Sequence, residues 1–213
     1  MSAISNLDWR EVREHYNLRY AIYKQLLELV KQAKRSEFVE LLLGISDPNR
    51  NYSAVEHGLG PYILSENVNA VDRVWELAAQ FRVLKTAHEV PTLIRQARLE
   101  YLQIGVGSEA SCMVNPRVCW VANARTIWTQ LVIKHADDFD KADMELRLYR
   151  DADSTSEMNY AIWTEIHSEL ATSMTRIAEE GDQLARKAGV AAGSLTYLWA
   201  DCIANALYAG HYE

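Results

Sequence analysis

Apolar and polar side chains alternate along this chain with the period of an α-helix. Between Val12 and Val30 the apolar positions recur every three or four residues, and charged residues stand between them. This spacing gives a helix one apolar face. Asp8 to Glu11 has the form of a capping box, so the helix is predicted to begin there. A shorter apolar stretch, Phe38 to Leu43, ends at Gly44, a usual residue at a helix C-terminus.

Most of the remaining sequence shows the same helical pattern. Further helices are predicted over residues 71–87, 91–104, 123–135, 137–149, 154–186 and 195–207. Gly105, Gly107 and the pair Asn115-Pro116 are predicted to interrupt the chain between helices. The best strand candidate, Gly58 to Leu64, is short and contains Pro61, which a central strand does not tolerate. With no internal repeat or linker, the pattern predicts a mainly α fold, a single helix-rich domain over residues 1–213.

Composition and charge exclude several classes of protein. The 213 residues are 49% hydrophobic and 24% charged, which is typical of a globular chain. A net charge of -7 argues against non-specific nucleic-acid binding, because neutralising phosphates requires a basic surface. The apolar runs are far shorter than the roughly 20 residues that span a bilayer, and the N-terminus lacks a signal-peptide pattern. Cys112, Cys119 and Cys202 have no zinc-site spacing, so we expect no metal site and a cytoplasmic location.

One segment, residues 120–135, carries the strongest candidate chemistry. Its sequence, WVANARTIWTQLVIKH, places Asn123 and Lys134 eleven residues apart, which is three helical turns, so both lie along one side of a helix. Together with Arg125 they offer an amide, a guanidinium and an ammonium group, a suitable set for an anionic ligand. The same residues also fit a structural role, with Asn123 as the helix N-cap and the two cations in surface ion pairs.

Three segments of the sequence resemble motifs of the flavin-dependent thymidylate synthase family. Family members carry a block of the form GVPxExARxxLP, followed by a WTxNARSL helix that ends in an arginine. This chain reads GVGSEASCMVNP, then WVANARTI, with Lys134 at the position of the arginine, and the two glycine-to-proline blocks have equal length. Upstream, NYSAVEH resembles the family segment HxSPFEH, with Ser53, Glu56 and His57 matching. The matched segments cover about a fifth of the chain and occur in the family's order.

The chain also departs from the family pattern. The family motif RHRxxSxNExSxRY is not recognisable between the matched segments, where Arg95-Gln96-Ala97-Arg98 is the nearest sequence. Cys112 stands where the family has a nucleotide-binding arginine, Asn51 where it has a histidine, and Thr129 where it has an amide that faces the flavin. Lys134 keeps the positive charge of the family arginine without its bidentate guanidinium. These differences indicate either a different substrate or a lost activity.

The resemblance implies a function and a set of binding residues, but no catalytic residue. The residues expected at a flavin, FAD, are Ser53, Glu56, Asn123 and Arg125, and those expected at a pyrimidine nucleotide similar to dUMP are Glu109 and Lys134. In such enzymes reduced flavin relays a one-carbon unit from a folate to the pyrimidine ring, and the protein binds and positions the reactants. The family assembles as a homotetramer with a small antiparallel sheet, so a homo-oligomer and a sheet near Gly58 to Leu64 are expected.

An acidic run follows the candidate helix, over residues 135–145. Its carboxylates and His135 suit a divalent metal. However, Asp137 and Asp138 stand at the start of a predicted helix, where carboxylates favour the helix dipole. Caps and a solvated face are therefore the preferred interpretation.

The long C-terminal helix presents two further sets of candidates. Glu165, His167 and Glu169 lack the spacing of a paired metal motif and are predicted to form a solvated stripe. Several aromatic residues are candidates for stacking on a ligand ring, although core packing is usual for such side chains. They are Trp120, Trp128, Tyr149, Tyr160 and Trp163.

Two functions remain open. The first is that of a flavin-dependent thymidylate synthase-like protein, an enzyme or a binding protein, that takes a pyrimidine nucleotide with a flavin. The second is that of a non-catalytic helical interaction or oligomerisation protein that has lost the ancestral activity. The equal spacing within the matched segments favours the first.

Overall fold

Helices form almost all of the secondary structure. The computed structural model describes residues 3–49, 52, 55, 57–150 and 156–212, and these residues form helices and turns but no strand. The predicted mainly α class is therefore confirmed. The sheet expected near Gly58 to Leu64 is wrong, because this segment forms helix α4, Leu59–Ser65. Gly58 precedes the helix with a φ of 61°, and Pro61 lies in the first turn, where its missing N–H removes no helical hydrogen bond.

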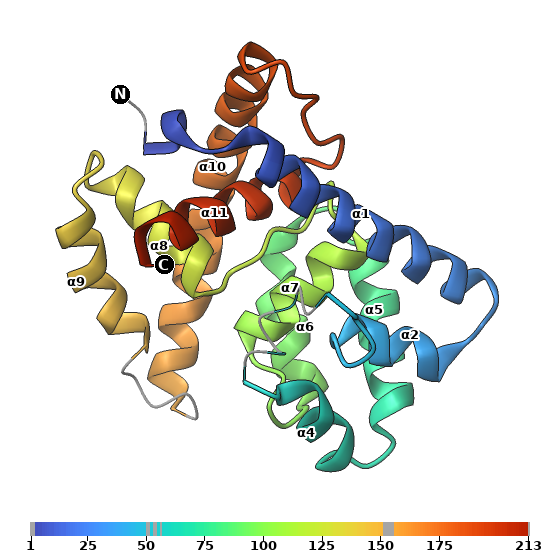
Figure 1. The fold of residues 1–213 in the computed structure, drawn as a ribbon. Coiled ribbons are helices and arrows are strands. Elements are labelled where there is room, and N and C mark those ends of the chain that lie inside the picture. Colours follow the sequence, from blue (N-terminus) through green and yellow to red (C-terminus); the bar gives the residue numbers. More distant parts are fainter. Residues whose placement is uncertain (1–2, 50–51, 53–54, 56, 151–155, 213) are drawn as a thin grey trace.

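The helices pack as two groups that α1 (Trp9–Lys31) joins (Figure 1). One group contains α2 (Arg35–Leu42), α4, α5 (Ala70–Val83), α6 (Val90–Ala97) and α7 (Ile104–Val114). The other contains α8 (Ala124–Lys134), α9 (Phe139–Arg150), α10 (Glu157–Lys187) and α11 (Thr196–Tyr212). Two short 3-10 helices, η1 (Ala3–Asn6) and η2 (Ala87–Glu89), complete the described elements. α1 contacts α2, α7 and α11, so it touches both groups.

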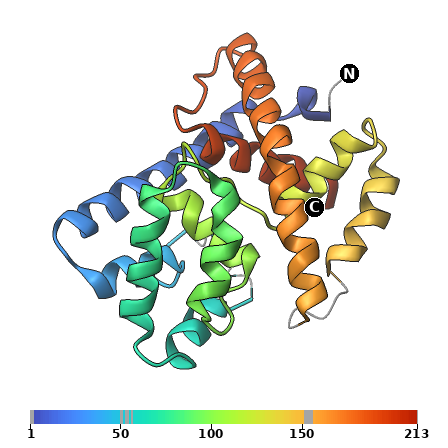
Figure 2. The ribbon, with the colours of Figure 1, turned by 180° about the vertical axis from the view of Figure 1, so that it is seen from behind.

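The two groups share one hydrophobic core. Every described α-helix contributes buried apolar side chains to it, and α4 contributes one, Ile63. Seen from behind, α10 runs the length of its group (Figure 2) and packs against α11. Gly181 permits this close approach, since a Cβ there would lie 2.3 Å from Cδ1 of Ile203. Within the described chain, no helix has the length and apolar character that a membrane span needs.

Two helix starts that the sequence predicts from caps are confirmed. Asp8 caps α1, and its carboxylate accepts hydrogen bonds from the backbone N–H groups of Arg10 and Glu11. Asn123 caps α8, as its position before the apolar run predicts. At the start of α10, the Oγ of Ser156 accepts a hydrogen bond from the backbone N–H of Asn159, 3.0 Å away. The predicted start of this helix, at residue 154, lies outside the described residues, and the N-cap that the structure shows is Ser156.

The predicted break at Gly105 and Gly107 is wrong. Both glycines lie inside α7, which begins at Ile104. The chain break falls earlier, where Arg98 and Tyr101 adopt left-handed conformations after α6. Gly107 belongs in the helix because α6 packs closely there. A Cβ at this position would lie 2.4 Å from Cδ1 of Ile94.

Candidate functional site

A cavity of about 660 Å³ lies where the two helix groups meet. The first turns of α7, α8 and α10 form much of its wall. The end of α9, one side chain of α11 and the residues around the start of α4 complete the described lining. The volume falls within the roughly 300–1,000 Å³ that is typical of ligand sites. The wall therefore comes from segments that are far apart in the sequence.

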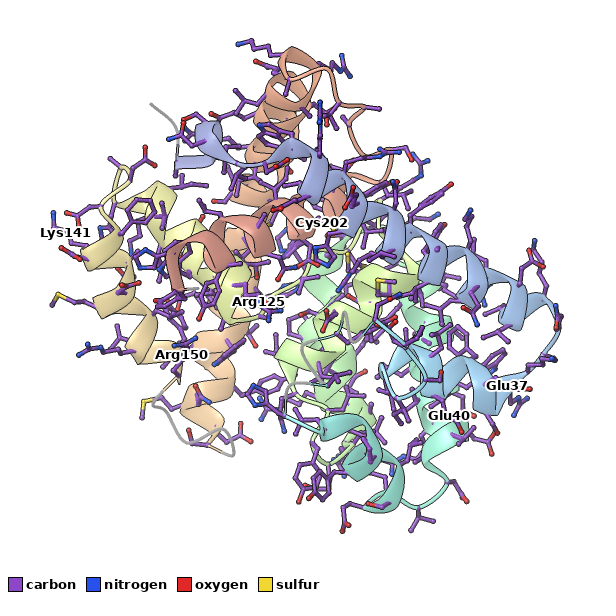
Figure 3. The ribbon with its side chains drawn as sticks, in the orientation of Figure 1. Glu37, Glu40, Arg125, Lys141, Arg150 and Cys202 are labelled. Atoms are coloured by element: carbon purple, nitrogen blue, oxygen red, sulfur yellow. The ribbon has the colours of Figure 1, made fainter. Side chains whose placement is uncertain are left out.

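Arg125 contributes a positive charge to this wall. It lies half-buried in the first turn of α8, and Figure 3 shows it near the centre of the molecule. The first backbone N–H groups of a helix carry a positive potential that adds to such a charge. α7 also begins at the cavity, with Gly105 and Val106 in the wall. Two helix N-termini and a guanidinium thus favour an anionic group in the cavity.

Asn123 has both a structural position and a place in the wall. Its Oδ1 accepts hydrogen bonds from the backbone N–H groups of Arg125 and Thr126, at 3.0 and 3.1 Å. In return, the Oγ1 of Thr126 accepts a hydrogen bond from the backbone N–H of Asn123 at 3.0 Å. The interpretation of Asn123 as an N-cap is confirmed. The same capping box holds the first turn of α8, and with it Arg125, in place at the cavity.

Aromatic side chains make up much of the remaining wall. Three of the five aromatic candidates from the sequence line the cavity: Tyr149, Tyr160 and Trp163. Tyr208 lines it as well. The other two, Trp120 and Trp128, are buried in the core. The hydroxyl of Tyr160 donates a hydrogen bond to the carbonyl of Pro91, and burial raises the pKa of Tyr160 to about 12. The rings offer a neutral, apolar surface on which a planar ligand can stack.

Arg150 is a second cation of the wall, at the C-terminal end of α9 (Figure 3). Its guanidinium donates a hydrogen bond to the hydroxyl of Tyr208 and lies 5.9 Å from the centre of that ring. Arg150 is exposed, so it stands at the solvent side of the cavity. The two residues are 58 positions apart. The sequence carries no signal that would have paired them.

Lys134 lies outside the cavity wall. Its Nζ is 2.5 Å from Oε1 of Glu145, and 50% of its side chain is exposed. The hydrogen bond to Glu145 raises the pKa of Lys134. His135 contacts the other carboxylate oxygen of Glu145 at 2.8 Å. The interpretation of Lys134 as one partner of a surface ion pair is confirmed, and the structure does not bring Lys134 together with Arg125 at one ligand.

Glu109 lies in the core instead of the cavity. Its Oε1 is 2.9 Å from the guanidinium of Arg19, which also lies 3.1 Å from Oδ2 of Asp201. None of the three residues is more than 2% exposed. Burial raises the pKa of Asp201, and the charge of Arg19 opposes this change. Glu109 therefore serves as a counter-ion for a buried arginine, with the ring of Tyr52 against the same guanidinium.

Ser53 and Glu56 lie outside the described residues. In the segment that resembles HxSPFEH, the structure describes Tyr52, Val55 and His57. Tyr52 is buried, whereas His57 is exposed and lines the cavity. Of the residues matched in this segment, His57 is thus the one that the structure places at the site.

The predicted solvated stripe on α10 is wrong at His167. Glu165 and Glu169 are exposed, but His167 is completely buried against Trp120, with ring centroids 5.2 Å apart. It follows Ile166 on the face of α10 that packs into the core. The polarity of histidine misled the prediction, because a residue two positions after Glu165 points to nearly the opposite side of the helix.

The acidic run after α8 forms hydrogen bonds and ion pairs within the chain. Asp138 accepts a hydrogen bond from the backbone N–H of Lys141 and pairs with its ammonium group at 2.7 Å. Asp143 accepts hydrogen bonds from the indole N–H of Trp128 at 2.7 Å and from the hydroxyl of Tyr212 at 2.6 Å. In the described ranges, no three potential metal ligands cluster together.

Asn159 is a wall residue that the sequence analysis did not single out. It is 6% exposed and lines the cavity, and its Oδ1 accepts no hydrogen bond from the described residues. A signal was present in the sequence, because Asn159 stands four residues before Trp163. That spacing places an amide and an indole on one face of a helix.

Comparison of the chain with protein-family models, with curated proteins and with solved structures found no match.

Proposed function

We propose that this chain binds a pyrimidine nucleotide and a flavin, and that the cavity between the helix groups receives the ring and phosphate of such a ligand. One observation carries the proposal. The three segments that resemble flavin-dependent thymidylate synthase motifs, although separated in the sequence, all contribute to the wall of the same cavity. Their contributions are His57, the pair Gly105 and Val106, and the run from Asn123 to Arg125.

The chemistry of the wall fits a phosphorylated heterocycle. Arg125 and the two helix N-termini favour phosphate oxygens. The aromatic rings favour a flat, uncharged ring system. Gly105 leaves the start of α7 open to a ligand, because among the described residues a Cβ there would approach only the carbonyl of Ala122, 4.0 Å away. A ligand with an anionic end and an aromatic end satisfies both parts of the wall.

The chain's own residues bind and orient in this proposal. Arg125 holds the anionic group, and Trp163 and Tyr160 exclude water from the ring. A bound flavin would supply the one-carbon transfer chemistry that flavin-dependent thymidylate synthases use. No catalytic residue is assigned to the chain.

Ligand titration of the purified chain tests the proposal. FAD and dUMP, added separately and together, are followed by calorimetry and by tryptophan fluorescence. Arg125→Gln is expected to weaken binding about 10- to 100-fold, which is the usual effect of losing hydrogen bonds from a charged group. Arg147→Gln, on an exposed arginine of α9 outside the cavity, is the matched control and should bind like wild type. A folded wild-type chain that binds neither ligand would contradict the proposal.

A second candidate function is that of a non-catalytic interaction protein, including a homo-oligomer. The outward face of α9 favours it, because Met144 and Leu148, one helical turn apart, are 69% and 66% exposed. This candidate predicts that the mass measured by light scattering falls in the double variant Met144→Lys, Leu148→Lys. It also predicts no thermal shift with FAD or dUMP, whereas a ligand that binds only the folded chain raises its melting temperature.

We also propose that the chain works in a reducing compartment, the cytoplasm. Cys112, Cys119 and Cys202 are all buried free thiols. Burial raises the pKa of Cys119 to about 12, so this thiol stays protonated and unreactive. Cell fractionation with an antibody against the chain tests the location.

A further inference from the structure

Asn159 carries a polar group that the described residues do not use. The residue lies in the first turn of α10, where its backbone N–H donates a hydrogen bond to Ser156. Its side chain takes no part in this cap, and Oδ1 is buried without a hydrogen-bond donor in the described structure. A buried amide carbonyl without a donor destabilises a folded protein, so such groups are rare and call for an explanation.

The position of Asn159 in the cavity wall explains this unpaired carbonyl. Asn159 and Trp163 are four residues apart on α10, and both line the cavity. Residues at this spacing are neighbours on one face of a helix. A planar ring that stacks on the indole of Trp163 therefore has its edge within one helical turn of the amide.

The chemistry of an amide limits what this edge can be. Asn offers an acceptor oxygen and a donor nitrogen side by side and carries no charge. It matches a ring edge that presents a donor next to an acceptor, which is how Asn recognises a base edge in DNA. A phosphate offers acceptors alone, and Arg125 on α8 already provides a cation for it. Oδ1 is buried in the unliganded chain, and because the last torsion of an Asn side chain is broad, a rotation of the amide would turn Oδ1 toward a ligand.

We propose that Asn159 is a specificity-determining residue of the cavity, and that it pairs with an imide edge of the bound ring. An imide is an N–H between two carbonyls, and uracil and the isoalloxazine ring of flavins share it. Oδ1 accepts the hydrogen bond of the imide N–H, and Nδ2 donates to a neighbouring carbonyl. The inference rests on the proposed function and adds the edge of the ring that the chain reads.

The wild-type chain alone provides the first test. Calorimetry compares dUMP with N3-methyl-dUMP, and FMN with N3-methyl-FMN. Methylation removes the imide N–H, so each of these analogues is expected to bind at least about tenfold more weakly than its parent. The pair that shows the difference identifies whether uracil or isoalloxazine supplies the imide. Equal binding of parent and analogue in both pairs would overturn the proposal.

The variant Asn159→Leu provides the second test. It keeps a similar volume and removes both polar atoms of the amide, so the affinity for the parent ligand should fall about tenfold or more and the discrimination against the N3-methyl analogue should disappear. Its melting temperature without ligand should equal or exceed that of wild type, because an unpaired buried carbonyl is removed. A purely structural role would instead lower the melting temperature and leave the discrimination intact, and that result would overturn the assignment.

Failure of this inference differs from failure of the proposed function. If wild type binds none of dUMP, FMN and their analogues, the proposed function is wrong and the inference falls with it. If wild type binds dUMP or FMN and Asn159→Leu binds and discriminates in the same way, the inference alone is wrong. Asn159→Asp, which keeps an acceptor and loses the donor, replaces Asn159→Leu if the latter does not fold. Asn159→Asp should also bind the parent ligand more weakly than wild type does.

Discussion

The imidazole of His167 lies against the indole of Trp120, with an angle of 30° between the two ring planes. The indole N–H of Trp120 donates a hydrogen bond of 2.7 Å to the backbone carbonyl of His167. Both ring nitrogens of His167 are buried and have no hydrogen-bond partner within the described structure. A proton on this ring would be poorly solvated, so burial lowers the pKa of His167 to about 4.

This histidine should make the fold sensitive to acid. In the unfolded chain its pKa has the ordinary value of 6.5, so between pH 6.5 and pH 4 the unfolded state takes up a proton that the folded state refuses. Its contribution to stability is therefore complete above pH 6.5 and is lost as the pH falls toward 4. The two pKa values, 6.5 and about 4, correspond to a loss of about 3 kcal/mol.

His167→Phe should remove the contribution of His167 to this acid sensitivity. Phenylalanine keeps the ring beside Trp120 and has no proton to gain. The free energy of unfolding is measured by urea titration at pH 7 and at pH 4. Its decrease between the two pH values should be about 3 kcal/mol smaller in the variant than in wild type. His57→Phe, on an exposed histidine, is the control and should keep the wild-type difference. An unchanged pH dependence in His167→Phe would show that other groups are responsible.

Gly181→Ala should destabilise the contact between α10 and α11. The added Cβ would lie 2.3 Å from Cδ1 of Ile203, which forces one side chain to move. Overpacking of this kind costs about 1–3 kcal/mol. Ile203→Val removes the clashing methyl group and by itself should cost about 0.5–1.5 kcal/mol.

The double variant Gly181→Ala, Ile203→Val tests whether that single contact is responsible. Because the valine makes room for the new Cβ, the double variant should be more stable than the sum of the two single effects predicts. Urea unfolding of the four proteins gives the coupling energy directly. Additive effects would mean that the glycine is required for another reason.

Arg19→Met should destabilise the chain by about 3–5 kcal/mol, because it leaves the carboxylates of Glu109 and Asp201 in the core without this cation. Chemical denaturation measures the loss. Arg10→Met, on an exposed arginine of the same helix, should change stability by less than about 0.5 kcal/mol. A small effect of Arg19→Met would show that the two carboxylates do not stay buried and charged when this cation is removed.

Lys134→Gln separates the geometry of this chain from the family resemblance. The resemblance implies that Lys134 contacts the nucleotide, whereas the structure places it in a surface pair with Glu145, outside the cavity. The geometry predicts that dUMP and FAD affinities stay within about twofold of wild type, because an exposed ion pair contributes about 0–1 kcal/mol to stability and nothing to the cavity. A tenfold loss of affinity would instead restore the role that the resemblance implies.

Local patterns in the sequence were sufficient to predict most helices. Asp8 and Asn123 each precede an apolar periodic run and each cap the helix that follows. Capping depends on hydrogen bonds between residues two or three positions apart, so the sequence contains all the information that it needs. Likewise, the sequence alone predicts that a helix begins after Asn123 and extends to Lys134, as α8 does.

Features that depend on packing between distant segments could not be predicted in this way. Gly107 was predicted to break the chain, but it lies inside α7. A glycine is needed there because Ile94 of α6 occupies the space that a side chain would fill. His167 looked solvent-exposed, and Trp120, 47 positions away, covers it. The cavity likewise joins α7, α8, α9, α10 and α11, and the unused carbonyl of Asn159 became visible only when its surroundings were known.

The buried charges of Arg19, Glu109 and Asp201 also bear on how the protein is made. Their helices α1, α7 and α11 are synthesised in that order. Until α11 has been synthesised, Arg19 lacks the carboxylate of Asp201. The core can close around these charged groups only once α11 has left the ribosome, so a nascent chain stopped before α11 should remain a substrate for chaperones and proteases.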